Sequence, residues 1–150
     1  MIGNLCEFLG EDEISFPILK KGIKNNTLDG ELVEKDFDYK CTKKGHIVSI
    51  PNPKPPHSYD CIVDYKMSGK LIKCQVKSSK SETEVVISSG TASNKKPYSK
   101  NLIDFICIWL RGSNRWFHIP IGEVYGLKKI RLGKHKSIYM KYLDNWNFEK

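Results

Sequence analysis

The chain has 150 residues, enough for one domain that buries a single hydrophobic core without disulfide or metal support. Its 25 Lys and Arg residues outnumber 17 Asp and Glu residues, and the net charge of +8 favours a polyanionic partner, although a basic enzyme of another class has the same balance. No apolar segment approaches the roughly 20 residues that span a bilayer, and the first residues lack a basic region followed by an apolar signal core. We therefore expect a cytoplasmic protein without a membrane partner.

The cysteines and histidines carry no metal-binding pattern. No two cysteines form a CxxC pair, and three lie in apolar runs, so we expect reduced, structural thiols; the five are Cys6, Cys41, Cys61, Cys74 and Cys107. The histidines are too scattered to predict zinc from spacing, and we interpret them as surface or DNA-contacting residues: His46, His57, His118 and His135.

The first part of the chain predicts an extension followed by a helix and a strand. Residues 1–29 contain an acidic segment, a proline and a turn-rich stretch, and we interpret them as an N-terminal extension. A helix is expected over residues 31–44, with Asp29 and Gly30 at its entry and Gly45 as its stop. Residues 46–51 favour a strand, and the prolines that follow indicate a stiff connection.

The next segment has the local signature of a β-hairpin. Residues 59–65 and 70–77 are rich in strand formers and are joined by a turn at Ser68 and Gly69. If those two residues form the whole loop, Asp60 lies directly opposite Lys77 and Gln75 lies one diagonal step away.

Strand alternation predicts a polar patch on this hairpin. Side chains alternate between the two faces of a strand, so Gln75 and Lys77 share one face and Val76 takes the other. With Asp60 opposite, an aspartate, an amide and an ammonium group converge where a divalent cation would fit. The alternative is a structural ion pair between Asp60 and Lys77 on a solvated face.

The second half of the chain predicts further strands and two basic segments. We expect strands over residues 84–88, 104–110 and 115–119, a short helix over residues 121–125 and a helical tail over residues 137–148. The longest apolar run, residues 104–110, indicates a buried central strand. Residues 90–101 form a basic loop with aromatic and amide side chains suited to phosphate and base-edge contacts, unless it is an ordinary solvated loop. Residues 128–136 are the second basic segment, and the element order indicates a single α/β domain.

Several of these segments together resemble the PD-(D/E)xK nuclease superfamily, in which an aspartate begins one strand and an acid-x-lysine tripeptide ends the next. The matching residues are Asp60 and the tripeptide Gln75-Val76-Lys77. The segment from Gly30 to Glu34 is similar to the family's first core helix, where a glutamate often joins the metal site. Tyr59 replaces the family's proline, and Gln75 replaces its usual acid, which removes one negative charge.

The resemblance implies a fold and a domain layout. The fold class is α/β, a restriction-endonuclease-like core with a mixed central sheet flanked by helices. The whole chain, residues 1–150, forms a single nuclease domain. Within it, residues 1–29 are the N-terminal extension, 30–132 the catalytic core and 133–150 the C-terminal segment.

The resemblance also implies the roles of the site residues. Asp60 and the Val76 carbonyl would bind Mg²⁺, with Gln75 and Glu34 completing or orienting its ligand shell, and Lys77 would position the attacking water. This sparse set suits magnesium, which commonly uses only one or two carboxylates. Glu34 has an alternative role as a surface acid that stabilises the helix dipole, with Glu31 and Asp36 as substitutes.

The pattern looks most like intron-encoded homing endonucleases of this superfamily found in cyanobacteria. Such a resemblance implies a homotetramer that makes double-strand breaks in long double-stranded DNA targets. The predicted DNA-binding residues are Lys80, Asn94, Lys95, Lys96, Tyr98, Lys100 and Arg131. Three alternatives stay open: a Holliday junction resolvase, a restriction endonuclease and a non-catalytic DNA-binding module.

Overall fold

The computed structural model describes residues 26–52, 57–89, 94–133 and 137–150. A five-stranded sheet has the order β1-β2-β3-β5-β6, and a separate pair joins β4 and β7. The β3–β5 pair is parallel and the other neighbours are antiparallel, so the main sheet is mixed. The strands are β1 Ile47–Ser49, β2 Cys61–Asp64, β3 Leu71–Ser79, β4 Glu84–Val86, β5 Phe105–Leu110, β6 Arg115–Pro120 and β7 Lys129–Arg131.

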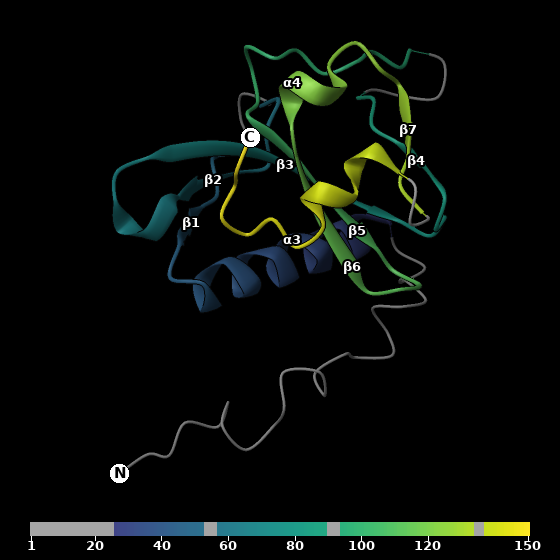
Figure 1. The fold of residues 1–150 in the computed structure, drawn as a ribbon. Helices are drawn as coiled ribbons and strands as arrows, with labels where there is room; N and C mark the ends of the chain where they lie inside the picture. Colours follow the sequence, from purple (N-terminus) through teal and green to yellow (C-terminus); the bar gives the residue numbers. More distant parts are fainter. Residues whose placement is uncertain (1–25, 53–56, 90–93, 134–136) are drawn as a thin grey trace.

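Helix α3 (Asn26–Lys43) runs along one face of the main sheet (Figure 1). Its buried residues Val33, Phe37 and Cys41 follow at intervals of four, which is the spacing of a single helix face. The helix ends at Gly45, whose φ of +85° lies in the left-handed region. There His46 N–H donates to the Cys41 carbonyl at 3.1 Å and Gly45 N–H to the Thr42 carbonyl at 2.9 Å, the two bonds of a Schellman motif.

This helix was expected over residues 31–44, with Asp29 at its entry, and it begins earlier. Asp29 lies inside the first turn of α3 because the helix continues back to Asn26. The carboxylate there binds a buried arginine, as described below. That tertiary contact, with Arg111, stabilises a turn for which the local sequence gives no signal.

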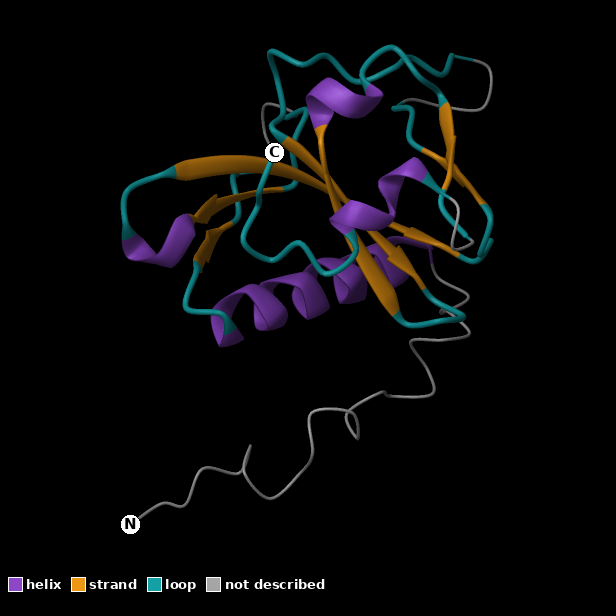
Figure 2. Cartoon of the chain, viewed as in Figure 1, coloured by secondary structure: helices purple, strands orange, loops and turns teal. Residues whose placement is uncertain are grey.

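Two core clusters lie on opposite faces of the main sheet. The first joins α3 to the buried side chains Cys61, Cys74, Val76 and Cys107. The second packs the other face beneath β4, β7, α4 (Ile121–Val124) and the 3₁₀ helix η2 (Ile138–Tyr142), all visible in Figure 2. The sheet is therefore covered on both faces, and its most buried strand is β5, as the apolar run predicted.

The β2–β3 hairpin is present, but its predicted register is wrong by two residues. Cys61 pairs with Cys74 and Asp64 with Leu71, while Tyr65 N–H donates to the Lys70 carbonyl at 3.0 Å. The loop therefore has four residues, 66–69, rather than two. It is closed by the Asp64 carboxylate, which accepts Gly69 N–H at 2.9 Å, and Gly69 adopts a φ of +80°.

Two other expectations need correction. The tail was expected to be helical over residues 137–148, but only Ile138–Tyr142 forms a short 3₁₀ helix, since Leu143 adopts extended backbone angles. The histidines were expected on the surface or at DNA, yet His46 and His118 are buried. The His46 ring accepts Lys66 N–H at Nδ1 at 3.0 Å and lies 2.7 Å from the Trp146 carbonyl through Nε2.

His118 belongs to the hydrophobic interior. Its ring lies 4.1 Å from that of Trp146, measured between centroids, and stacks beside Trp116. Burial, with a smaller effect of His46, lowers its pKa to about 3. His57 is exposed, whereas His135 and Cys6 lie outside the described residues. The other four cysteines are buried free thiols, as expected, and no described helix has the length and apolar content to span a membrane.

Candidate active site

The candidate site begins where β2 separates from β3. Asp60 N–H donates to the Cys74 carbonyl at 2.9 Å, next to the last paired position, Cys61 with Cys74. Beyond it, the Asp60 carboxylate accepts Val76 N–H at 2.7 Å. The carboxylate thus takes the place of the next backbone acceptor on β2, which fixes its position over β3.

Gln75 holds the same carboxylate from the side. Its side-chain amide donates to the Asp60 oxygen that also accepts Val76 N–H. The two-residue shift of register explains this contact, because it brings Gln75 into the place across from Asp60 that Lys77 was expected to occupy. A shift by an even number of residues keeps every side chain on its face, so the polar cluster survives the change.

Lys77 lies on the same face of β3 as Gln75. Ile72, Cys74 and Val76 are buried against α3, and the alternating residues face the other way. The Lys77 ammonium lies 3.4 Å from the Ser88 carbonyl and 5.3 Å from the centre of the Tyr98 ring. The structure therefore brings Asp60, Gln75 and Lys77 together, and adds Ser88, which sequence reasoning missed because a backbone carbonyl leaves no signal in the sequence.

Glu34 reaches this site from α3. It is half-buried, and its pKa is raised first by burial, next by the negative charge of Asp60 and then by that of Glu31. The charge of Asp60 therefore acts on the Glu34 carboxylate across the space between α3 and the start of β2. Asp36, which the sequence left as a substitute, also has a raised pKa through burial, but Lys40 and Trp116 oppose the shift.

Burial dominates the electrostatics of the other two ionisable groups. It raises the pKa of Asp60, while the hydrogen bonds from Val76 and Gln75 and the charge of Lys77 act in the opposite direction. It lowers the pKa of Lys77, where the attraction of Asp60 opposes the shift and the repulsion of Lys95 adds to it. A carboxylate that is disfavoured as an anion is stabilised by a cation, so this arrangement favours metal binding.

The donors fit a hard divalent cation. Gln75 and Val76 contact the Asp60 carboxylate, and the charge of Asp60 acts on a second carboxylate, Glu34 of α3. Oxygen donors of these kinds suit a hard divalent cation. Within the described ranges, no group of three or more His, Cys, Asp or Glu side chains has the arrangement of a metal site.

The predicted DNA-binding residues fall in three places. The segment after residue 93 lies beside the site: the charge of Lys95 lowers the pKa of Lys77, and the ring of Tyr98 contacts the Lys77 ammonium. Asn94, Lys96 and Lys100 are exposed in the same segment. Lys80 is exposed just after β3, and Arg131 lies in β7, opposite Glu84 of β4.

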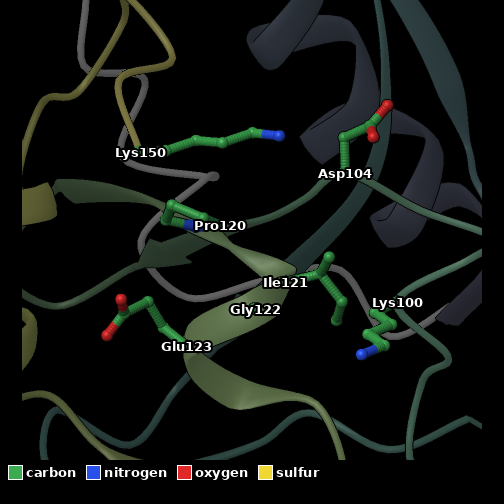
Figure 3. A pocket seen from close by; sticks show the side chains of 7 residues that line it. All are labelled: Lys100, Asp104, Pro120, Ile121, Gly122, Glu123 and Lys150. Carbon is green, nitrogen blue, oxygen red and sulfur yellow. The ribbon is translucent and has the colours of Figure 1, made fainter.

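A surface cavity of about 280 Å³ lies near the start of β5 and is drawn in Figure 3. The Asp104 carboxylate at its edge accepts Lys73 N–H at 2.8 Å, and two lysines, Lys100 and Lys150, belong to its lining. The residues that line it do not include Asp60, Gln75 or Lys77, so the candidate catalytic groups lie outside this cavity.

Comparisons with known proteins identify the family of the chain. A family model described as PD-(D/E)XK endonuclease matches residues 24–148. No significant match was found among curated proteins. The chain is similar in structure to the bacterial homing endonuclease I-Ssp6803I, with a TM-score of 0.68 and 25% identity over 81% of this chain and 90% of that chain. A second similarity, to the Archaeoglobus fulgidus Holliday junction resolvase Hjc, has a TM-score of 0.46 and 14% identity over 67% of this chain and 87% of that chain.

Proposed function

Because the chain belongs to the PD-(D/E)XK endonuclease family, we propose that it is a magnesium-dependent homing endonuclease that makes double-strand breaks at a long, specific DNA site. Endonuclease activity and a DNA substrate follow from the family. The similarity to a homing endonuclease supports the site-specific function. The single observation that carries the proposal is the convergence of Asp60, Gln75 and Lys77 at one point on β3.

Each residue of the cluster has a role in this proposal. Asp60 and Glu34 hold the ion with the Val76 carbonyl, and Gln75 orients the Asp60 carboxylate. A divalent ion held by these residues would supply positive charge for polarising the scissile phosphate, activating water and stabilising the leaving oxygen. Lys77 positions the attacking water and balances the negative charge of the phosphate.

Binding to long DNA draws on the basic segments. The net charge of +8 supports phosphate contacts, which fix register and orientation on the duplex. In this proposal the exposed residues Lys80, Asn94, Lys95, Lys96, Lys100 and Arg131 contact DNA. Replacing one of these lysines by alanine should weaken binding to all sequences and reduce its salt dependence.

We also propose a homo-oligomer, with the homotetramer expected from the family resemblance. Two exposed side chains on neighbouring strands support an interface, because Ile47 of β1 and Leu71 of β3 flank Asp64 of β2 and are 48% and 63% exposed. Light scattering should give about four times the 17.2 kDa mass of one chain. A mass of one chain at micromolar concentration would contradict the oligomer without affecting the nuclease assignment.

One assay separates the proposed function from its alternatives. Purified protein is incubated with a supercoiled plasmid library of genomic fragments, because a site-specific enzyme cuts only plasmids that carry its target, in Mg²⁺ and, in parallel, with EDTA. Linear product only with Mg²⁺ supports a metal-dependent nuclease, and binding without cutting in either condition identifies a DNA-binding module. Faster cutting of a four-way junction than of linear duplex would favour a resolvase, and mapping of fragment ends from a genomic library identifies the target.

A further inference from the structure

Tyr98 and Ser88 enclose the Lys77 ammonium from two sides. The Ser88 carbonyl lies 3.4 Å from Nζ, and the centre of the Tyr98 ring lies 5.3 Å from it. A cation over an aromatic face is attracted by the ring's quadrupole, and the attraction grows as water is excluded. Two neutral groups from one segment therefore hold the cation that faces Asp60.

This segment is closed at its base by a backbone bridge. Ser89 N–H donates to the Lys96 carbonyl at 2.9 Å, and Lys96 N–H returns a bond of the same length to the Ser89 carbonyl. Ser88 precedes the bridge and Tyr98 follows it, so the bridge fixes the separation of the two groups that contact Lys77. Ser88 is buried, and Tyr98 packs against the second core cluster.

The phenol of Tyr98 stays neutral in this place. Burial, followed by the charge of Asp60, raises its pKa to about 12. A neutral phenol does not compete with Asp60 for the ammonium group as a second anion would. The ring face is then the part of Tyr98 that acts on Lys77.

We propose that Tyr98 is a positioning residue, which holds the Lys77 ammonium over the active site through its ring and not through its hydroxyl group. This role replaces the DNA contact expected from the sequence, and it rests on the proposed function of Lys77. The bridge at Ser89 and Lys96 also joins Tyr98 to the basic residues Lys95 and Lys96. DNA bound by these lysines would therefore lie beside the group that holds Lys77.

The test compares Tyr98→Leu, which removes the ring, with Tyr98→Phe, which keeps it. Tyr39→Leu is the matched control, because Lys43 lies 5.6 Å from the Tyr39 ring on α3, in a similar contact on the opposite face of the sheet. Single-turnover cleavage in Mg²⁺ is measured on a plasmid that the wild type linearises, and DNA affinity is measured without metal. Circular dichroism establishes that each variant is folded.

Tyr98→Leu should slow single-turnover cleavage about 10- to 100-fold, because a small misplacement of a catalytic group has effects of that size. Its DNA affinity should stay within about twofold of wild type, and Tyr98→Phe should cleave within about threefold of wild type, since the ring contact is retained. A loss of affinity with an unchanged single-turnover rate would identify a DNA contact and overturn the proposal. Equal slowing by Phe and Leu would assign the effect to the hydroxyl group and would also overturn it.

A second measurement does not depend on cleavage. Lysine acetylation by a water-soluble reagent, followed by peptide mapping, compares Lys77 with exposed Lys80 in the same sample. Lys77 should react faster relative to Lys80 in Tyr98→Leu than in wild type or Tyr98→Phe. If the wild type does not cut DNA, the proposed function fails, but the ratio of Lys77 to Lys80 acetylation still tests whether the Tyr98 ring shields Lys77. An equal ratio in wild type, Tyr98→Phe and Tyr98→Leu would overturn the proposal about Tyr98. This holds also where Tyr98→Leu is too unstable for kinetics.

Discussion

The carboxylate of Asp60 accepts the backbone N–H of Val76 at 2.7 Å, at the point where β2 leaves β3. Because the two strands separate at this point, a side chain rather than a backbone carbonyl accepts the Val76 N–H. A regular ladder would pair Val76 N–H with a backbone carbonyl, and the aspartate would then be free to turn toward water. Here the Asp60 side chain accepts the hydrogen bond that a backbone carbonyl would otherwise accept, and this bond fixes the position of the carboxylate.

Gln75→Glu tests the role of the amide beside Asp60. The substitution replaces a hydrogen-bond donor by a second carboxylate, so we expect a loss of roughly 1–3 kcal/mol in the free energy of unfolding without metal. Addition of Mg²⁺ should recover more stability in this variant than in wild type, because the ion neutralises the added charge. Urea unfolding in EDTA and in Mg²⁺ measures both effects. Gln75→Ala is the control for loss of the hydrogen bond alone, and equal metal responses in all three proteins would refute the expected role.

Glu34→Gln tests the electrostatic link between α3 and the site. Burial first, and then the charge of Asp60, raises the pKa of Glu34 above its ordinary value of 4.5. The folded state therefore binds this proton more tightly than the unfolded state, and the resulting stability is present below pH 4.5 and is lost as pH rises through the folded pKa. In EDTA, the free energy of unfolding should fall less steeply with pH across this window in the variant than in wild type. Parallel curves for the two proteins would contradict the link.

Asp29→Ala tests the anchor between α3 and the end of β5. Arg111 is 2% exposed and donates to both oxygens of Asp29, at 2.8 and 2.6 Å, and to the Ser78 hydroxyl at 2.8 Å. Removal of the acid leaves a buried guanidinium without this partner, so we expect a loss of about 3–5 kcal/mol in the free energy of unfolding. Arg111 also binds Ser78, the residue after Lys77 in β3, so a displaced Arg111 should shift Lys77 and slow cleavage.

Glu84→Ala is the matched control for that prediction. It removes the exposed ion pair with Lys129, in which the two charged atoms lie 2.9 Å apart. An exposed pair contributes about 0–1 kcal/mol. Chemical denaturation of both variants measures the difference, and equal losses would show that the Arg111 pair does not act as a buried anchor.

Much of the main sheet and α3 could be predicted from local patterns. Val33, Phe37 and Cys41 repeat at helical spacing, Gly45 supplies the stop, and the apolar run now seen as β5 predicts a buried strand. Their positions depend on residues close in sequence. The predicted hairpin register was wrong by two residues, but an even shift keeps each side chain on its face, so the predicted convergence of Asp60, Gln75 and Lys77 did not depend on the exact register.

The rest depends on contacts between distant residues. The hairpin register follows from the bond between Asp64 and Gly69, which closes a loop two residues longer than the shortest turn. Ser88 reaches Lys77 through a backbone carbonyl, and His118 is buried by aromatic residues from β6 and the C-terminal segment. The strand β7 lies in a basic segment that gave no strand signal. It forms by pairing with β4, which is distant in sequence.

The most direct measurement compares wild type, Asp60→Asn and Lys77→Ala for DNA affinity and for Mg²⁺-dependent plasmid cleavage in the same preparations. We predict that both variants bind DNA within a few-fold of wild type and cleave it at least about 10²- to 10³-fold more slowly, as expected for loss of a group that stabilises the transition state. Normal cleavage by both variants would contradict the assignment of Asp60 and Lys77 as the catalytic centre.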